Sequence, residues 1–593
     1  MSSVLTFELP LILAQNIKVT NWLTPVWILS LGIAAGFILA ILMLIKIVFI
    51  QRIGFFNTVA EKPVLKYTFG IIQSIIYLAL ILGFFYWRVG PDVFEFDKLI
   101  FPLCFLIPIC LLMGFGVWSL VSRRMIGETT GLFREGFLGW VNRVCIFMTA
   151  FAILGFVLAP FNGFGFIKFV DEPMEFVESI KRLPFTKQYR ESVEIPPGST
   201  TDSGTVVPVG FDGKELQTLS FKSDQKLEVL HLPITEDIDP SFILEIPVQD
   251  EPNVYYQRRD GRGKIPPSFI ENLYVKNLSK SSPARVELIW NLRPVYGEVV
   301  LVPFVAVLVF SLYLFYLILA TMCPKVFAIA HSTFKTEVNQ PLYLLVMATG
   351  AVFILGSIYV PYNTFGEDIK MYKDSGLTLI RVLAIFLAIW AASKSVAAEI
   401  EGRTALTVLS KPVGRRQFIF GKFTGISLAI GLMFIVLGIW FFSWVAYKPI
   451  YDYQEASKGL AEWPICFIEA THTVPGLFLC FLEVLIFVAI SIAISTRMGV
   501  LANFLLCFAI YVLGHLTPLL VQSSYAEFQP VVVFGQLIAI VFPVLNHFDV
   551  QAAINTNSPV PMTYLGWSVI YTGIYGAMAM LLALVLFEDR DLA

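Results

Sequence analysis

A polar, cationic stretch interrupts the apolar C-terminal half of the chain at residues 399–422. Glu399 and Glu401 suit the positive end of a helix, and Pro412 forces the chain to turn. Apolar contact can come from Ala405, Leu406, Val408 and Leu409. Arg415 and Arg416 can pair with acidic residues of a partner or with lipid head groups. This composition is typical of a short amphipathic helix that docks into a groove on a partner. A basic loop that only fixes membrane orientation is the simpler interpretation.

The same stretch superficially resembles a phosphate-binding loop at Gly414 and Gly421-Lys422. Such a loop needs four residues between its glycines and Ser or Thr after the Lys. Here six residues intervene, and Phe423 follows the lysine. We therefore expect no nucleotide site, no bound cofactor and no enzyme activity in this chain itself.

Ionisable residues within apolar segments are costly and are candidates for function. Glu483 lies near the middle of one apolar run and His515 within the next. For Glu483 we weigh a structural hydrogen bond inside the bundle against a role in substrate binding or gating. His515 fits a contact between helices, and Arg381 is expected to extend to the interface. The sequence alone indicates no proton-relay pair among them.

The composition places the chain in a membrane. Of its 593 residues, 57% are hydrophobic and 15% are charged, which lies outside the normal soluble range. The net charge of −2 gives no case for nucleic-acid binding. The seven cysteines form no disulfide framework, because six lie in or beside apolar segments and only Cys466 is expected in a wet loop. No residues form a convincing metal site.

A membrane-crossing helix needs about 20 mostly apolar residues. Eleven segments meet this condition: 25–50, 67–87, 99–121, 138–159, 297–323, 342–361, 376–396, 423–446, 474–496, 499–521 and 563–587. The predicted fold class is therefore an all-α polytopic membrane protein with an inserted β-rich domain. The apolar run 531–545 is too short to cross, and either a re-entrant segment or a short helix over the bundle would fit it.

Orientation follows from the short basic loops. With eleven spans, the Lys- and Arg-rich loops after the first, third, seventh and ninth spans share one side, whereas 522–562 has neither residue. This places the N-terminus and residues 160–296 outside and the C-terminus in the cytoplasm, in a plasma (inner) membrane.

Residues 160–296 form one polar block with short β-rich runs separated by turn-forming residues. These runs are Thr205–Val209, Leu216–Phe221, Leu227–Leu232, Phe242–Val248, Val254–Gln257 and Val286–Trp290. They predict an antiparallel sandwich. Its single histidine, His231, and its scattered acids favour a binding or assembly module over an enzyme. The triplet at Asn277 fits a glycosylation pattern that also arises by chance.

Residues 399–422 resemble the signature of ABC-2 type transporter permeases. The matching residues are Glu399 or Glu401, Gly402, Thr404, Leu406, Leu409-Ser410-Lys411-Pro412, Arg415 and Gly421-Lys422. Arg403, which separates Gly402 from Thr404, departs from the pattern. The resemblance covers 324–593, where Val326–Val338 looks like the amphipathic elbow helix of the family and Phe542–Asp549 like its outer-face element.

The resemblance implies a membrane-spanning exporter subunit that works with separate cytoplasmic ABC ATPases, which would bind ATP and Mg. It also implies a second permease copy or a homologous permease, with membrane lipids around both. The expected domains are a four-helix region at 1–159, the external domain at 160–296, a fifth span at 297–323 and a six-helix permease at 324–593. The signature residues are the expected coupling-helix site, with Glu483 and His515 as further candidates.

Two other classes of function stay open. An ion-coupled secondary carrier would more often show inverted repeats with broken helices, which the sequence lacks. A membrane-anchored receptor with an external sensing domain would need an output domain, and the chain ends at Ala593 soon after its last span. A membrane enzyme would need a catalytic cluster in a wet region. The sequence does not indicate the cargo.

Overall fold

The structure is a computed structural model that divides into two compact units, Asp171–Leu301 and the remainder of the chain. It describes residues 22–51, 63–89, 110–111, 114, 135–158, 176, 179–180, 187–197, 205–212, 215–230, 244–246, 248–257, 269–279, 282–292, 296–360, 367–397, 399, 413–457, 461, 463–522, 533 and 542–588. The statements below concern these residues.

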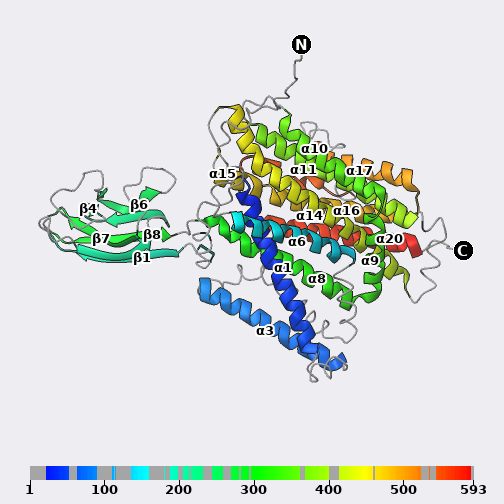
Figure 1. The fold of residues 1–593 in the computed structure, drawn as a ribbon, viewed down its shortest axis with the longest axis horizontal. Helices are drawn as coiled ribbons and strands as arrows, with labels where there is room; N and C mark the ends of the chain where they lie inside the picture. Colours follow the sequence, from blue (N-terminus) through cyan, green and yellow to red (C-terminus); the bar gives the residue numbers. More distant parts are fainter. Residues whose placement is uncertain are drawn as a thin grey trace, which may run out of the picture. The chain divides into compact units, whose positions relative to one another are not determined.

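The larger unit is a bundle of α-helices (Figure 1). Before the polar insert these are α1 (Thr24–Gln51), α3 (Pro63–Val89) and α6 (Gly136–Leu158). After it come α8 (Leu301–Met322), α9 (Pro324–Val338), α10 (Pro341–Gly356), α11 (Asp368–Ala392), α14 (Arg415–Glu455), α15 (Trp463–Thr471), α16 (Val474–Ser495), α17 (Val500–Gln522), α19 (Gln551–Asn555) and α20 (Met562–Glu588). A π-helix, η7 (Ser393–Ala397), extends α11.

Eight helical segments of the described chain are long and apolar enough to cross a membrane, and each coincides with a predicted span. Helices α3 and α17 also form where spans were predicted, although their described apolar stretches, Tyr67–Leu80 and Val500–Leu516, are shorter. The predicted span 99–121 lies outside the described residues except at 110, 111 and 114. The multi-pass prediction is therefore confirmed for eight of eleven spans.

Helix α14 is longer than the span predicted at 423–446. It contains 41 residues, about 60 Å at 1.5 Å per residue, against a hydrocarbon layer of about 30 Å. The residues beyond 446 continue the helix because Lys448 pairs with Asp452 one turn later, at 2.9 Å. Helix α15 then follows, so the prediction that Cys466 lies in a wet loop is wrong: it is fully buried in that helix.

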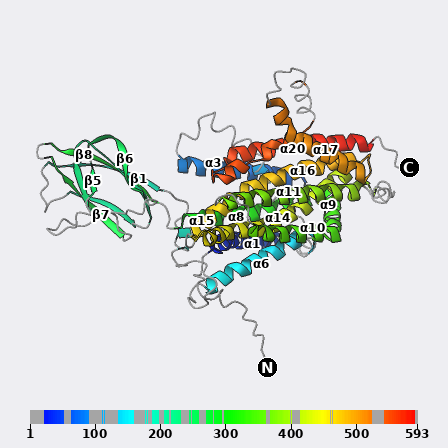
Figure 2. The ribbon, with the colours of Figure 1, turned by 90° about the horizontal axis from the view of Figure 1, so that it is seen from above.

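The centre of the bundle is formed by α11, α14 and α16, which lie side by side in both views (Figures 1 and 2). More than half of the membrane-spanning windows that include these helices is buried inside the protein, against 39% or less elsewhere. Apolar residues on all sides of α16 explain its position, since a helix without a polar face is buried by protein or lipid. Polar side chains on these three helices therefore meet other protein groups.

A pair of glycines joins α1 to α8. A Cβ on Gly32 would lie 2.7 Å from the Cβ of Val305, and one on Gly36 would lie 2.6 Å from the carbonyl oxygen of Ala306. Glycines four residues apart lie on one helix face and let two backbones approach closely. The side chains that face these two glycines are aliphatic, so the α1–α8 seam is held by close packing.

The smaller unit contains two four-stranded antiparallel sheets (Figure 2). The strands are β1 (Lys187–Ile195), β2 (Thr205–Asp212), β3 (Leu216–Ser223), β4 (Leu227–Leu230), β5 (Leu244–Ile246), β6 (Gln249–Gln257), β7 (Phe269–Asn277) and β8 (Ala284–Leu292). Their orders are β1-β8-β3-β6 and β2-β7-β4-β5. Both sheets contribute to one apolar core, which includes Phe221, Val275 and Trp290.

All six predicted β-runs fall on strands, and two strands were not predicted. The edge strand β1 pairs Lys187–Ile195 with β8, and most of its residues are charged or polar; only Val193 and Ile195 at its end are aliphatic, so its apolar alternation is too short to predict a strand. In β7 the buried side chains at Ile270 and Leu273 are three residues apart, near an irregularity in its pairing with β2. That shift breaks the two-residue alternation from which a strand is recognised.

Candidate functional site

The structure describes part of the signature stretch. Glu399, Arg415, Gly421 and Lys422 are described. The other predicted coupling residues, Glu401, Gly402, Thr404, Leu406, Leu409, Ser410 and Pro412, lie outside the described residues. The described part forms the beginning of α14 and a single position, Glu399, just beyond the π-helix that extends α11.

Lys422 joins these two segments. Its ammonium lies 2.5 Å from a carboxylate oxygen of Glu399, and its side chain is only 7% exposed against 33% for the glutamate. The ammonium also lies 5.4 Å from the centre of the Phe418 ring, one turn earlier on α14. A nearly buried charge of this kind needs its partner, because removing one member leaves the other desolvated and unpaired.

A third charged side chain, Glu337, reaches the same place from α9. It is buried, and the amide of Gln340 donates a 2.9 Å hydrogen bond to its carboxylate. The indole of Trp390 on α11 donates in turn to Gln340 at 3.3 Å. Burial raises the pKa of Glu337 to about 7, and the nearby charges of Lys422 and Lys394 act in the opposite direction.

Close backbone packing brings α9 to this position. A Cβ on Gly421 would lie 2.6 Å from the Cβ of Ile329, and one on Gly425 would lie 2.6 Å from the carbonyl oxygen of Ala330. The two glycines are again four residues apart, as in a small-residue helix interface. The elbow helix predicted at Val326–Val338 is thus present, and its buried face packs against α14.

We refer to Glu337, Glu399, Gly421, Lys422 and Gly425 as the α9–α14 junction. It unites the elbow helix, the start of the longest helix and the first residue of the signature stretch. Sequence reasoning identified three of its members through the signature. It missed Glu337 and Gly425, although the four-residue spacing from Gly421 to Gly425 was a readable signal for a close helix contact.

Arg415 has a different environment from the one expected. Its guanidinium donates to the carbonyl oxygen of Glu588 at 2.7 Å and to that of Phe587 at 3.4 Å. These carbonyls end α20, where a cation is favoured by the helix dipole. Arg415 therefore closes the C-terminal end of α20 within this chain, rather than facing only lipid or a partner protein.

The two intramembrane candidates, Glu483 and His515, lie together and share a third partner. The His515 imidazole is 3.3 Å from one carboxylate oxygen of the fully buried Glu483. Arg381 lies 3.5 Å from the other oxygen and is 9% exposed. Arg381 therefore does not extend to the interface, and the three side chains form a buried charged group that the sequence did not indicate. The opposite charges of Arg381 on α11 and Glu483 on α16 suggest an ion pair. The sequence does not show, however, which faces of the two helices meet.

A polar cluster that sequence analysis missed surrounds Asn503 on α17. Its amide nitrogen lies 2.7 Å from the hydroxyls of Ser393 and Ser491 and 2.9 Å from that of Ser495. All four residues are buried. Ser393 begins the π-helix, a conformation that recurs at functional sites and helix irregularities. The cluster holds α11, α16 and α17 together near the α9–α14 junction end of those helices.

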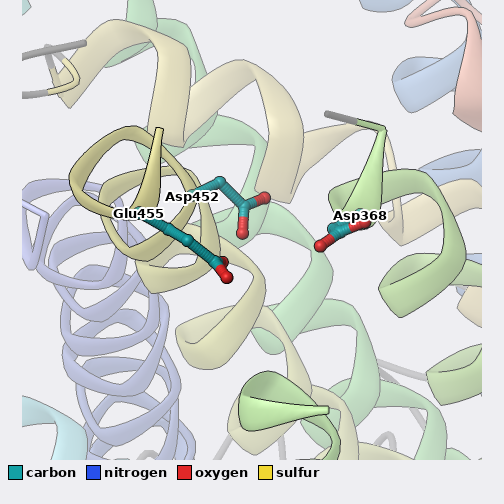
Figure 3. A group of neighbouring side chains, drawn as sticks. All are labelled: Asp368, Asp452 and Glu455. Atoms are coloured by element: carbon teal, nitrogen blue, oxygen red, sulfur yellow. The ribbon is translucent and has the colours of Figure 1, made fainter. Parts of the chain in front are cut away.

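Charged side chains also gather where α11 begins and α14 ends, the end of the bundle opposite the junction. Buried Lys373 pairs with Glu469 and lies 3.1 Å from the side-chain oxygen of Asn557. Asp368, Asp452 and Glu455 bring carboxylate oxygens within 4.8 Å of one another (Figure 3). Buried Lys448 pairs with Asp452 there, so the charge of one of these carboxylates is already balanced within the chain.

In the smaller unit, the glycosylation triplet does not present an acceptor. Asn277 is 2% exposed. Its amide donates to the carbonyl of Ser282 at 3.0 Å, and its side-chain oxygen accepts from the amide of Ser279 at 2.9 Å. These bonds close the turn between β7 and β8. His231 and the run 531–545, except for 533 and 542–545, lie outside the described residues.

The comparisons with known proteins bear on the larger unit. Residues 299–592 match the family described as ABC-2 family transporter protein. The match begins at 299 rather than at the predicted 324, so it includes α8. A comparison with curated protein sequences gave no match. The match, together with the candidate spans of the described chain, shows that the chain belongs to the ABC-2 transporter family through residues 299–592.

Proposed function

We propose that this chain is the membrane-spanning permease subunit of an ATP-driven ABC-2 type exporter. Separate cytoplasmic ATPase subunits would bind ATP and Mg and perform the hydrolysis. A second copy of the chain, or a homologous permease, would complete the transport path. In this proposal the junction end of the bundle and the C-terminus face the cytoplasm of a plasma (inner) membrane, and the β-sheet unit faces outside.

One observation carries the proposal: the end of the signature stretch is tied to the elbow helix and to α14 at one place. The Lys422–Glu399 pair links the stretch to α14 across 23 positions. The Gly421 and Gly425 contacts link α14 to α9. A force applied at Glu399 by a docked ATPase would therefore reach both helices through these contacts.

Helix α14 can carry that displacement across the membrane. At 41 residues it is about 60 Å long, and it packs against α9, α10, α11, α15, α16 and α20. A packed helix transmits a shift as a rigid body, because close-packed interiors deform little. Movement at the junction would then alter the packing at the far end, where Lys448 donates to the carbonyl oxygen of Ile358 at 3.0 Å.

The signature residues that are not described keep their proposed roles. Leu406 and Leu409 would provide the apolar contact with the ATPase, Gly402 and Thr404 the turn, and Ser410 and Pro412 the exit from the coupling helix. Charge reversal at Glu401, or Pro412→Gly, should uncouple hydrolysis while the protein stays in the membrane. Charge reversal at Glu401 is the clearer test of docking, because a change at Glu399 would also break its ion pair with Lys422.

Purification of the full-length chain in mild detergent tests the function itself. We expect a subunit with ATPase activity to co-elute, and we expect Glu401→Lys to weaken that association or its coupling. Arg497→Glu provides the control, because Arg497 is an exposed charge in a different loop predicted on the same face. Purification without any ATPase under conditions that keep the chain folded would contradict the proposal.

A second candidate, an ion-coupled carrier, has one observation in its favour. Arg381, Glu483 and His515 form a buried charged group within the bundle, and such groups mark proton pathways in pumps and carriers. The two functions differ in their energy source. Transport that stops when the proton gradient collapses but continues without ATP would favour the carrier, and the reverse result would favour the exporter.

The N-terminal helices and the β-sheet unit have no proposed part in energy coupling. The α1–α8 seam attaches the former to the family region, and the latter carries a complete apolar core of its own. We propose that these regions recognise the substrate or an external partner, in agreement with the binding or assembly role expected from the sequence.

A further inference from the structure

A cavity of about 240 Å³ lies between the start of α6 and the end of α9. Gly139 and Arg143 line it from α6, and Lys335 and Asn339 line it from α9. At about 30 Å³ per water molecule, it has room for a small polar group. It lies beside the elbow helix, and neither the α9–α14 junction residues nor the described residues of the signature stretch line it.

Arg143 is the charged residue of this cavity lining for which the described residues provide no ion pair. It lies seven residues beyond the first residue of α6, about 10 Å along a candidate membrane span. Its guanidinium lies 4.6 Å from the centre of the Trp140 ring. It makes no ion pair with any residue that the structure describes, and it is exposed on the surface of α6, so its charge is open to a group from outside the chain.

The rest of the lining gives the cavity a positive balance. Lys335 lies 3.0 Å from the carboxylate of Glu135 at the cavity edge, so these two charges offset each other. Among the described lining residues, Arg143 then leaves one net positive charge. Gly136 and Gly139 of the first turn of α6 also line the cavity, and the first amides of a helix favour an anion. A group with one negative charge fits this balance.

The surface of α6 beyond Arg143 is apolar and exposed. Ile146, Phe147, Ile153, Leu154 and Val157 are each 45% to 69% exposed. Their spacing places them on the same helix face as Arg143. An anion held at Arg143 would thus have an apolar strip continuing from it along a membrane span, which is the arrangement of a phosphate head group and its acyl chains.

We propose that this cavity binds the phosphodiester of an anionic glycerophospholipid from the membrane leaflet on the side of α9. Arg143 and the first turn of α6 hold the phosphate, and Asn339 contributes a hydrogen bond to the head group. The acyl chains lie along the exposed face of α6. The lipid thereby connects the N-terminal helices to the elbow helix, and this binding does not depend on an ATPase partner.

The test uses the full-length protein in detergent, stripped of lipid and then titrated with phosphatidylglycerol under native mass spectrometry. Arg143→Gln should weaken lipid retention at least about tenfold, the effect of losing one charge-assisted hydrogen bond. Arg497→Gln, which removes an exposed arginine from a loop predicted to lie on the same face, is the matched control and should retain lipid. Arg143→Lys should retain part of the binding.

Two further arms distinguish the sources of the phosphate. Inorganic phosphate should compete weakly, because it lacks acyl chains, and phosphatidylcholine should bind less well than phosphatidylglycerol, because it has no net negative charge. Equal lipid retention by Arg143→Gln and Arg497→Gln would overturn the site. Inorganic phosphate that binds as tightly as the lipid would overturn the lipid assignment. Unchanged thermal unfolding of Arg143→Gln shows that the variant is folded.

Discussion

Two pairs of glycines join helices in the larger unit, and their surroundings differ. Gly32 and Gly36 fit α1 against α8 among aliphatic side chains, whereas Gly421 and Gly425 fit α14 against α9 beside Glu337, Lys422 and Glu399. Both pairs allow close approach of two helix backbones in the same way, because the two glycines of each pair are four residues apart. A purely apolar seam holds two helices in one arrangement. A seam beside charges can also respond to a change in those charges.

An added side chain at each seam should have the largest effect. Gly425→Val would place a Cβ 2.6 Å from the Ala330 carbonyl and should cost about 3 kcal/mol, at the upper end for overpacking. It should also abolish the response of the bundle to ATP. Gly36→Val should cost a similar amount, but folded protein should still respond to ATP.

Thermal unfolding and ATP hydrolysis by the purified complex measure the two effects separately. Gly573→Ala serves as the control, because a Cβ there meets nothing within 4 Å. If Gly36→Val abolished the ATP response as completely as Gly425→Val at equal stability, the two seams would not differ in function.

Glu337 gives the α9–α14 junction a pH dependence that the α1–α8 seam lacks. A carboxyl whose pKa is raised from 4.5 to about 7 contributes stability that is present below pH 4.5 and is lost as the pH rises through 7. The loss amounts to roughly 2–3 kcal/mol at pH 7. Glu337→Gln should remove this dependence. Unfolding measured from about pH 5 to about pH 8 would show a flatter profile, and an unchanged slope would refute the assignment.

Lys422→Met should destabilise the protein by about 2 kcal/mol, because Glu399 and Glu337 lose a neighbouring cation. Glu399 is partly exposed to water, which limits the loss. The aliphatic part of the side chain is retained, so the packing against Phe418 is preserved. Denaturant or thermal unfolding measures the loss. A loss no larger than that of Lys335→Met, an exposed lysine on α9, would show that the Lys422 pair contributes little.

His515→Leu should have the smallest effect, about 1 kcal/mol. It removes the 3.3 Å contact to Glu483 while Arg381 still balances the carboxylate. Glu483→Leu should cost more, because it leaves Arg381 buried without its partner. Comparison of the two variants by thermal unfolding tests this order. Equal losses would mean that Arg381 does not compensate for the missing histidine.

Much of the fold could be predicted from the sequence, because membrane spans need only a long apolar run. The elbow helix was also accessible, since its buried residues Phe327, Ala330 and Phe334 follow the helical period. The helical continuation of α14 past residue 446 was missed, because polar residues that pair one turn apart, such as Lys448 and Asp452, do not continue an apolar run. The charged edge strand β1 was missed for a related reason.

The sequence predicts several residues of the candidate site, but it does not predict the contacts between them. The signature pointed to Glu399, Gly421 and Lys422 as residues of one motif. It could not show that Lys422 reaches back to Glu399, or that Glu337 from α9 joins them, because long-range contacts depend on how helices pack. The Arg381–Glu483 pair was missed for the same reason, since its members lie on α11 and α16.

The central claim is that the Lys422–Glu399 link transmits movement from the ATPase to the bundle. The most direct measurement uses a cysteine placed at exposed Ser332 of α9, in a Cys323→Ser background, and follows its labelling rate with and without ATP. We expect Lys422→Glu and Glu399→Lys each to abolish the ATP-dependent change while hydrolysis continues, and the double exchange to restore it. Single variants that respond to ATP like the unmodified protein would contradict the account.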